Sequence, residues 1–267
     1  MAISVSALKD KPLPTNDWII NGLLTRKNTG FLMGPPKRAA KSWLLLAAAW
    51  NLSEGFPIWG MSYLSPPRQM RVVYFTQEDT EADIQKRVLI HINGGRREPN
   101  DRLWLVPKNL NIKLDTQLGE GLIKRELDSV VAQAGAIDLV MLDPFRRMHD
   151  GDENDSSVIA KLWRTLEKIH NTYDCSTLIA HHVKKPPNDR SAYDPTDPNQ
   201  GRGSGDIYGG GDAFVMVVPG PTAPDGKSWR QVTLHYESKR GEQMPPTIHR
   251  VWLTTGQVQH TGAVAPA

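Results

Sequence analysis

Short apolar runs alternate with amphipathic stretches through residues 29–180, and this alternation restricts the possible folds more than any other feature. The strand-like runs are 29–33, 70–76, 103–106, 137–142 and 175–180. The stretches between them that have helical periodicity are 42–53, 80–92, 118–133 and 156–169. Strand and helix in repeated succession are typical of a parallel sheet covered by helices on both faces. We therefore expect an α/β protein.

The 267 residues allow one domain or two, and the pattern favours one. Residues 1–17 have no periodic apolar face, which predicts a flexible arm before a single domain at 18–255 and a flexible tail at 256–267. Residues 184–228 hold 15 of the 42 glycines and prolines, so we expect a long loop region there. The remaining strand-like runs, expected as antiparallel strands at the sheet edge, are 213–218, 230–236 and 247–253.

Composition excludes several classes of protein. The net charge of +3 and the 39% of hydrophobic residues are ordinary for a globular protein and exclude a disordered or strongly basic one. The longest apolar run, residues 43–50, is far shorter than the roughly 20 residues of a membrane span. A single cysteine, Cys175, permits no internal disulfide and fits a reducing compartment. We expect a cytoplasmic protein with no membrane partner.

The sequence GPPKRAAKS follows a predicted strand and opens a predicted helix, which is the position of a phosphate-binding loop. In such loops backbone N–H groups surround the phosphates, a lysine reaches them and a hydroxyl holds Mg²⁺. The candidate nucleotide-binding residues are Gly34, Pro35, Pro36, Lys37, Arg38, Ala39, Ala40, Lys41, Ser42 and Trp43.

This loop departs from the usual G-x-x-x-x-G-K-[ST] pattern at two points. Ala40 replaces the second glycine, and Gly34 lies seven residues before Lys41 rather than six. Because a Cβ obstructs a backbone conformation that glycine adopts freely, we expect the loop to differ locally. A basic surface turn is the alternative interpretation of the segment.

Three predicted strands end in polar residues that suit phosphoryl transfer. Asp143 ends an apolar strand and would lie beside Mg²⁺, Glu78 could deprotonate a water, and His181 and His182 could sense a phosphate. Each has an ordinary alternative as a turn, cap or loop residue. The carboxyl ends of parallel strands meet at one edge, however, where open α/β sheets bind ligands.

These motifs, in this order, resemble the RecA-like hexameric ATPases of the plasmid RepA replicative helicase family. The resemblance covers about residues 17–255 and rests on DWIINGLL at 17–24, the altered loop, QED at 77–79, DP at 143–144 with GDEND at 151–155, AHHVKK at 180–185, RGS at 202–204 and SKRG at 238–241. It implies a RecA-like P-loop NTPase core, a mostly parallel sheet with antiparallel C-terminal edge strands.

The resemblance also implies roles for single residues. Lys41 and Ser42 would bind ATP and Mg²⁺, Asp143 would hold the metal through water, Glu78 would be the catalytic base, and His182 would report the γ-phosphate state. Lys239 and Arg240 resemble a basic finger that completes a neighbouring subunit's site, with a simple turn as the alternative. Arg87 is expected to stack on the adenine.

In a ring of such subunits, single-stranded DNA passes loops that follow the strands ending at Asp143 and His182. The candidate DNA-binding residues are Arg146, Arg147, Lys184, Lys185, Arg190 and Arg202, with Tyr193 and Tyr208 available for stacking. Residues 184–225 hold four bases and six acids, so the second loop is not a simple basic tract.

The leading hypothesis is thus a Mg²⁺-dependent ATPase that forms a homo-oligomeric ring, expected to be a hexamer, and moves along single-stranded DNA in plasmid or phage replication. One alternative is a nucleotide- or DNA-binding accessory protein with a degenerate loop and little or no hydrolysis. A small-molecule kinase is a remoter option, because related phosphate-binding loops serve many phosphoryl acceptors.

Charge is unevenly distributed along the chain: residues 115–156 hold four bases and ten acids, whereas residues 226–250 hold five bases and two acids. This division is expected if one subunit's basic surface meets the next subunit's site.

Overall fold

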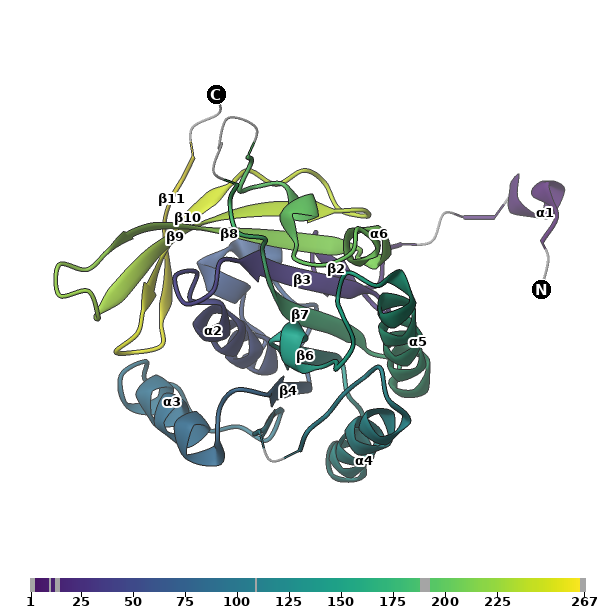
Figure 1. Ribbon diagram of the computed structural model, residues 1–267, viewed down its shortest axis with the longest axis horizontal. Coiled ribbons are helices and arrows are strands. Elements are labelled where there is room, and N and C mark those ends of the chain that lie inside the picture. Colours follow the sequence, from purple (N-terminus) through teal and green to yellow (C-terminus); the bar gives the residue numbers. More distant parts are fainter. Residues whose placement is uncertain (1–2, 10, 13–14, 109, 188–192, 265–267) are drawn as a thin grey trace.

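The computed structural model describes residues 3–9, 11–12, 15–108, 110–187 and 193–264 (Figure 1). Its main feature is a nine-stranded sheet in the order β11-β10-β9-β8-β3-β7-β6-β4-β5. The strands of this sheet are β3 (Thr29–Gly34), β4 (Val72–Thr76), β5 (Leu103–Val106), β6 (Leu139–Asp143), β7 (Ser176–His182), β8 (Ala213–Thr222), β9 (Trp229–Ser238), β10 (Thr247–Trp252) and β11 (Val258–Ala263). A small antiparallel pair, β1 (Trp18–Ile20) and β2 (Leu24–Thr25), precedes it.

Helices connect the strands as the alternation predicts. The α-helices are α1 (Val5–Lys9), α2 (Lys41–Glu54), α3 (Glu81–Asn93), α4 (Gln117–Ala134), α5 (Ser156–Tyr173) and α6 (Asp206–Gly210). Short 3₁₀ turns are η1 (Ile58–Gly60), η2 (Ser62–Leu64), η3 (Phe145–Arg147) and η4 (Pro198–Gln200). Within the described part of the chain, no helix is both long enough and apolar enough to cross a membrane.

The two faces of the sheet bury separate apolar clusters. On β6, Leu139 and Met141 pack in the cluster that contains the buried residues of α2, whereas Val140 and Leu142 pack in the cluster of α4 and α5. Successive residues of a strand point to opposite faces, so a strand buried on both sides must be apolar throughout. Figure 1 shows α2 on one side of β6 and β7 and α5 on the other. The predicted α/β class is confirmed, and the architecture is RecA-like.

Strand β8 runs parallel to β3, which corrects the expectation that every late strand would be antiparallel. Residues 183–212 return the chain from the end of β7 to the starting edge of the sheet, and such a crossover makes the next strand parallel. The antiparallel arrangement begins at β9 and continues through β10 and β11.

Both ends of the chain differ in detail from the sequence prediction. Residues 258–263 form β11 against β10, where a loose tail was expected. Gly256, at a φ of +69°, reverses the chain before this strand, and its mostly polar sequence gave no strand signal. In the predicted arm, the short helix α1 lies away from the body of the protein (Figure 1). The division into arm, domain and tail stays a prediction.

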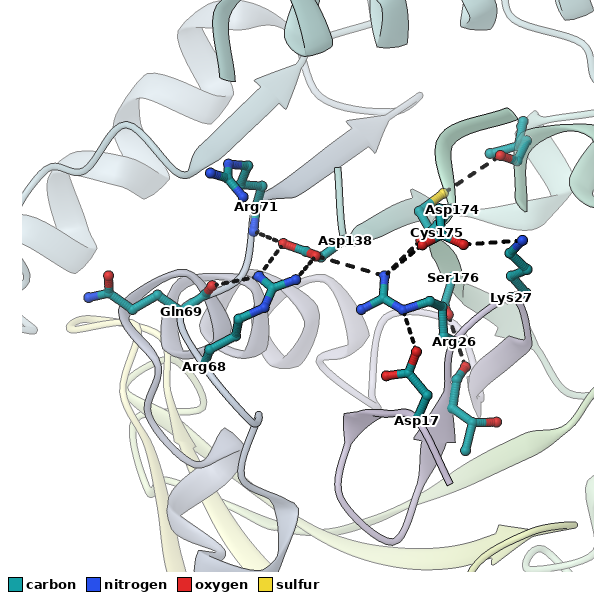
Figure 2. A network of polar contacts seen from close by, with 12 residues as sticks. Asp17, Arg26, Lys27, Arg68, Gln69, Arg71, Asp138, Asp174, Cys175 and Ser176 are labelled. Carbon is teal, nitrogen blue, oxygen red and sulfur yellow. Dashed lines mark hydrogen bonds and ion pairs between the residues drawn. The ribbon is translucent and has the colours of Figure 1, made fainter. Parts of the chain in front are cut away.

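A charged network closes the edge where the parallel strands begin (Figure 2). The buried carboxylate of Asp138, just before β6, accepts two hydrogen bonds from Arg68, at 2.6 and 3.0 Å, and one from the Arg71 backbone N–H at 2.8 Å. Arg26 lies 3.9 Å from the same carboxylate and also pairs with Asp17 at 2.7 Å. The network therefore joins the entry to β3, the entry to β4 and the entry to β6.

Candidate nucleotide-binding site

The loop between β3 and α2 begins at a glycine that the packing requires. A Cβ on Gly34 would lie 2.8 Å from the Val217 carbonyl oxygen and 2.9 Å from the Ala39 Cβ. Contacts this short do not occur for real side chains, so β3 can end beside β8 only with glycine at this position.

Ala40 occupies the left-handed region with φ 51° and ψ 30°, immediately before α2. Its carbonyl accepts the N–H groups of Trp43 at 3.1 Å and Leu44 at 3.0 Å, which starts the helix. Ala40 thus adopts a conformation that glycine takes freely, and Lys37 in the same loop also has a positive φ, of 63°. Such a backbone costs an alanine about 1–2 kcal/mol. The expected local difference from the usual loop stays a prediction. The methyl groups of Ala39 and Ala40 are buried in the α2 cluster, and this packing holds the strained turn in place.

Lys41 turns back onto the loop. Its ammonium donates to the Gly34 carbonyl at 2.8 Å and to the Pro35 carbonyl at 3.1 Å, and only 7% of the residue is exposed. Burial lowers the pKa of Lys41 to about 8, although the negative charges of Asp143 and Glu78 oppose this shift. The amine is therefore held at the centre of the loop, surrounded by acceptors that phosphate oxygens can replace.

Asp143 ends β6 close to the start of α2. Burial raises the pKa of Asp143, while hydrogen bonds from Tyr74 and Ser42 and the nearby Lys41 charge favour the ionised carboxylate. The Tyr74 hydroxyl donates to Asp143 Oδ2 at 2.6 Å. Sequence analysis missed Tyr74, and the available signal was a tyrosine in a strand buried on both faces, whose hydroxyl needs a partner.

The pair of Ser42 and Asp143 fits a Mg²⁺ site. In the described residues, no group of three or more His, Cys, Asp or Glu side chains is arranged to hold a metal. That finding suits Mg²⁺, which keeps several waters and takes one or two protein oxygens together with substrate phosphates. The serine hydroxyl and the aspartate carboxylate provide hard oxygen donors at the helix start, where phosphates also bind.

Glu78 lies in the turn after β4 with its side chain 54% exposed. Helix α3 is capped by Thr80, whose hydroxyl accepts the Asp83 N–H at 3.3 Å, so Glu78 is not the cap. Its carboxylate lies 3.6 Å from the Arg147 guanidinium. Glu78 is thus an exposed carboxylate that pairs with Arg147 and lies near Lys41, and its exposure leaves it accessible to water.

The two histidines at the end of β7 have different roles. His182 pairs in register with Gly34, and its pKa is lowered by burial and by the nearby Lys41 charge. His181 is buried, and its Nε2 lies 2.6 Å from the Arg202 carbonyl oxygen, a contact that fixes the following loop. The structure therefore places His182, rather than His181, beside the phosphate loop.

Comparison with known proteins identifies the family to which the chain belongs. A family model described as an AAA domain matches residues 1–188, which is more than half of the chain. The chain belongs to this AAA domain family. It is accordingly a P-loop ATPase domain, of a kind that binds ATP with Mg²⁺.

No curated protein matches the chain. Among solved structures, the KaiC-like protein PH0186 from the hyperthermophilic archaeon Pyrococcus horikoshii OT3 is similar, with 12% identity and a TM-score of 0.54. The match covers 91% of this chain and 93% of that protein. At this identity the similarity supports the RecA-like fold alone.

Two further arginines lie near the loop of this AAA domain. Arg87 pairs with Asp79 at 2.6 Å, and its guanidinium lies 5.7 Å from the centre of the Trp43 ring. Its expected stacking on the adenine stays a prediction. Arg230, on β9, was missed by sequence analysis and donates to the Lys37 carbonyl at the tip of the loop. No local motif marks Arg230, because β9 meets the loop only through the sheet.

Lys239 and Arg240 lie at the opposite edge of the sheet from the phosphate loop. Lys239 donates through its backbone to Asp212 at 2.9 Å and through its ammonium to Gly209 at 2.9 Å, near the start of β8. The turn interpretation also holds, since Ser238 Oγ accepts the N–H groups of Arg240 and Gly241. The length of β3, roughly 20 Å at about 3.3 Å per residue, separates this turn from the domain's own phosphate loop.

The candidate DNA-binding residues are spread over the segments that follow β6 and β7. Arg146 and Arg147 are exposed in η3, and Lys184 and Lys185 are exposed after β7. Arg202 is committed to the buried carboxylate of Glu153 at 2.5 Å. Arg190 lies outside the described residues. Tyr193 is half-buried, and Tyr208 donates to Glu237 at 2.7 Å. The loops after β6 and β7 are thus linked through the ion pair of Glu153 and Arg202.

Proposed function

We propose that this protein is a Mg²⁺-dependent ATPase that assembles as a ring and translocates single-stranded DNA, in the manner of RepA-type replicative helicases of plasmids and phages. The observation that supports hydrolysis is the meeting of Lys41, Ser42 and Asp143 at one sheet edge, with Glu78 and His182 beside them. Phosphoryl transfer needs positive charge and an aligned water more than covalent work by the protein.

In this proposal each side chain has a separate task. The Lys41 ammonium gives up its hydrogen bonds to the Gly34 and Pro35 carbonyls and donates to phosphate oxygens instead. The backbone N–H groups of the loop surround the same phosphates. Bound Mg²⁺ supplies charge neutralisation on the phosphate oxygens, and Ser42 and Asp143 would hold it. Glu78 orients the attacking water and accepts its proton. His182, next to Gly34, changes its contacts when the terminal phosphate leaves.

The position of Lys239 and Arg240 supports action between subunits. They lie at the edge where β8 begins and cannot serve their own loop, whereas a neighbour in a ring would present its loop to them. In this reaction class a trans-acting arginine contributes about 10³–10⁵ in rate. Arg146, Arg147, Lys184 and Lys185 follow β6 and β7 on the nucleotide side, where DNA contact could be sensed.

A second candidate is a nucleotide-binding accessory protein with little or no hydrolysis. The observation that favours it is the loop itself, because Ala40 is strained and Lys41 is hydrogen-bonded to its own loop carbonyls. A loop that keeps these contacts when ATP is present would bind the phosphates weakly.

Steady-state ATP hydrolysis with and without a single-stranded oligonucleotide separates the two candidates. We expect stimulated turnover in the parent and a loss of about 10²–10⁴ in rate on Glu78→Gln, with ATP binding retained. Glu98→Gln, an exposed glutamate in the loop before β5, is the matched control and should behave as the parent. Slow turnover with intact ATP affinity, unaffected by Glu78→Gln, would favour the accessory protein.

A further inference from the structure

A pocket lies at the same sheet edge as the phosphate loop but is separate from the loop. It has a volume of about 300 Å³ and is open to solvent on one side. Its lining residues are Gln77, Lys108, Leu110, Asn111, Lys113 and Arg147. They follow β4, β5 and β6, so three adjacent parallel strands deliver them to one place.

The chemistry of this pocket suits an oxyanion. Three of the six lining residues are cationic, and no carboxylate lines it. Lys108 is exposed, and its backbone N–H is fixed by the Asp79 carbonyl at 2.9 Å. Lys113 is held by the Arg147 carbonyl at 3.0 Å and pairs with Asp150 at 3.2 Å. The segment that carries Lys108 and Lys113 is therefore held in place by contacts of these two residues.

Gln77 provides an independent indication of a ligand. The residue is only 4% exposed, and in the described part of the chain its side-chain nitrogen has no hydrogen-bond partner. A buried donor without a partner is unfavourable, and native proteins rarely keep one without a reason. An oxygen of a bound anion would provide the missing acceptor.

We propose that this pocket binds a phosphate group, either a backbone phosphate of single-stranded nucleic acid or free inorganic phosphate. Lys108, Lys113 and Arg147 supply the charge, and Gln77 and Asn111 supply amide donors. Phosphate is preferred over a small carboxylate because several cations converge on one site with additional neutral donors.

Arg147 connects this pocket to the catalytic region. Its guanidinium lies 3.6 Å from the Glu78 carboxylate, and the residue also lines the pocket. A phosphate in the pocket competes with Glu78 for Arg147, which frees the carboxylate to act on water. Occupancy of the pocket is thereby linked to hydrolysis. This link rests on the proposed function, whereas binding in the pocket does not.

Crystals of the nucleotide-free protein soaked in sodium tungstate test the pocket directly. Tungstate is a tetrahedral oxyanion with a strong anomalous signal. We expect one anomalous peak at the phosphate loop and a second between Gln77, Lys108 and Arg147. A peak at the phosphate loop without one in the pocket would overturn the proposal.

Binding of a fluorescent oligothymidylate at several salt concentrations distinguishes the two sources of phosphate. If the source is nucleic acid, Lys108→Gln weakens binding several-fold and reduces the slope of log K against log salt by about 0.7, the value for one lost contact on a single strand. Lys161→Gln, an exposed lysine on α5, is the control and leaves both unchanged. An unchanged slope together with a tungstate peak in the pocket identifies free phosphate as the ligand.

The link to hydrolysis is tested with Arg147→Gln. We expect this substitution to raise the unstimulated rate of ATP hydrolysis and to reduce its stimulation by the oligonucleotide. Stimulation as large as in the parent would show that Arg147 does not couple the two sites. If the parent itself hydrolyses no ATP, the proposed function fails, while the tungstate result still decides whether the pocket exists.

Discussion

At Ala40, the backbone conformation that the fold requires differs from the conformation that an alanine prefers. Its left-handed backbone is unfavourable for any residue with a Cβ, yet the turn needs that conformation to bring Lys41 under the loop. Gly34 shows the opposite case, in which close packing against β8 excludes every side chain. One position of the loop thus needs an unusual backbone conformation and holds an alanine, whereas the other needs the absence of a side chain and holds the glycine that meets this need.

Replacing Ala40 by glycine should therefore cost little stability. Relief of about 1–2 kcal/mol of backbone strain offsets the loss of one buried methyl group, about 0.8 kcal/mol, and the greater freedom of glycine in the unfolded chain. We expect Ala40→Gly to change the free energy of unfolding by less than about 1 kcal/mol in urea denaturation.

Ala48→Gly is the matched control, since Ala48 is buried in the middle of α2. It should destabilise by about 2 kcal/mol through lost helix propensity and lost burial. Equal losses for the two variants would show that Ala40 bears no strain in solution.

The lowered pKa of Lys41 predicts the pH dependence of ATP binding. Lys41 is charged below about pH 8 and becomes neutral above it. Phosphate is already fully ionised above about pH 7, so the loss of the ammonium is the change that matters. We expect the affinity for ATP to fall by up to about tenfold from pH 8 to pH 9 in equilibrium titrations. In Lys41→Ala the decline should be absent, and a parent affinity that stays constant to pH 9 would contradict the assignment.

Among the elements, the starts of β3, β4 and β6 are joined by the Asp138 network rather than by apolar contacts (Figure 2). Burial alone would raise the pKa of Asp138, but the hydrogen bonds from Arg68 and Arg71 and the charges of Arg68 and Arg26 hold it below its usual value. The phosphate loop lies at the opposite edge of the same strands, after Gly34 at the end of β3. The edge where the strands begin is therefore closed by charge pairing.

Asp138→Asn should destabilise the protein by about 2 kcal/mol at pH 7, because charged hydrogen bonds at a buried site are lost. Because the folded pKa of Asp138 is lowered, this contribution is fully present above the unfolded value near 3.9, declines below it and is lost as the pH falls through the folded pKa. Urea denaturation at pH 7 and at pH 3 measures both effects.

The control is Glu120→Gln, which breaks an exposed pair with Lys168 and should cost less than about 1 kcal/mol. A difference between Asp138→Asn and the parent that persists unchanged at pH 3 would argue against an electrostatic origin.

Sequence patterns predicted the elements better than their connections. The alternation at 29–180 predicted the strands and helices of the core, because burial on two faces requires continuous apolar runs. It did not predict that β8 is parallel or that residues 258–263 pair, since direction depends on the crossover and β11 has a mostly polar sequence. For the candidate site, motifs identified Lys41, Ser42 and Asp143, but Tyr74 and Arg230 act through contacts distant in sequence.

At the scale of the whole molecule, the phosphate loop and the turn holding Lys239 and Arg240 lie at opposite edges of one sheet. In the proposed function these two parts form one composite site, and a single subunit holds them too far apart to use them together. A second copy that presents its turn to the loop would complete the site, which is why the proposed function requires assembly.

Mixing two inactive variants tests this arrangement. Lys41→Ala lacks the phosphate-binding amine and Arg240→Ala lacks the finger, so neither should hydrolyse ATP alone. In mixed oligomers, some sites combine an intact Lys41 from one subunit with an intact Arg240 from the next, and activity should return. Light scattering confirms that mixed oligomers form. An inactive mixture under those conditions would place Arg240 outside the catalytic site.

The most direct test of the central claim is the rate of ATP hydrolysis by the parent protein with Mg²⁺ and single-stranded DNA, measured beside Lys41→Ala. The account predicts Mg²⁺-dependent turnover that DNA stimulates and that falls by at least about 10² in the variant. A parent rate indistinguishable from that of Lys41→Ala would contradict it.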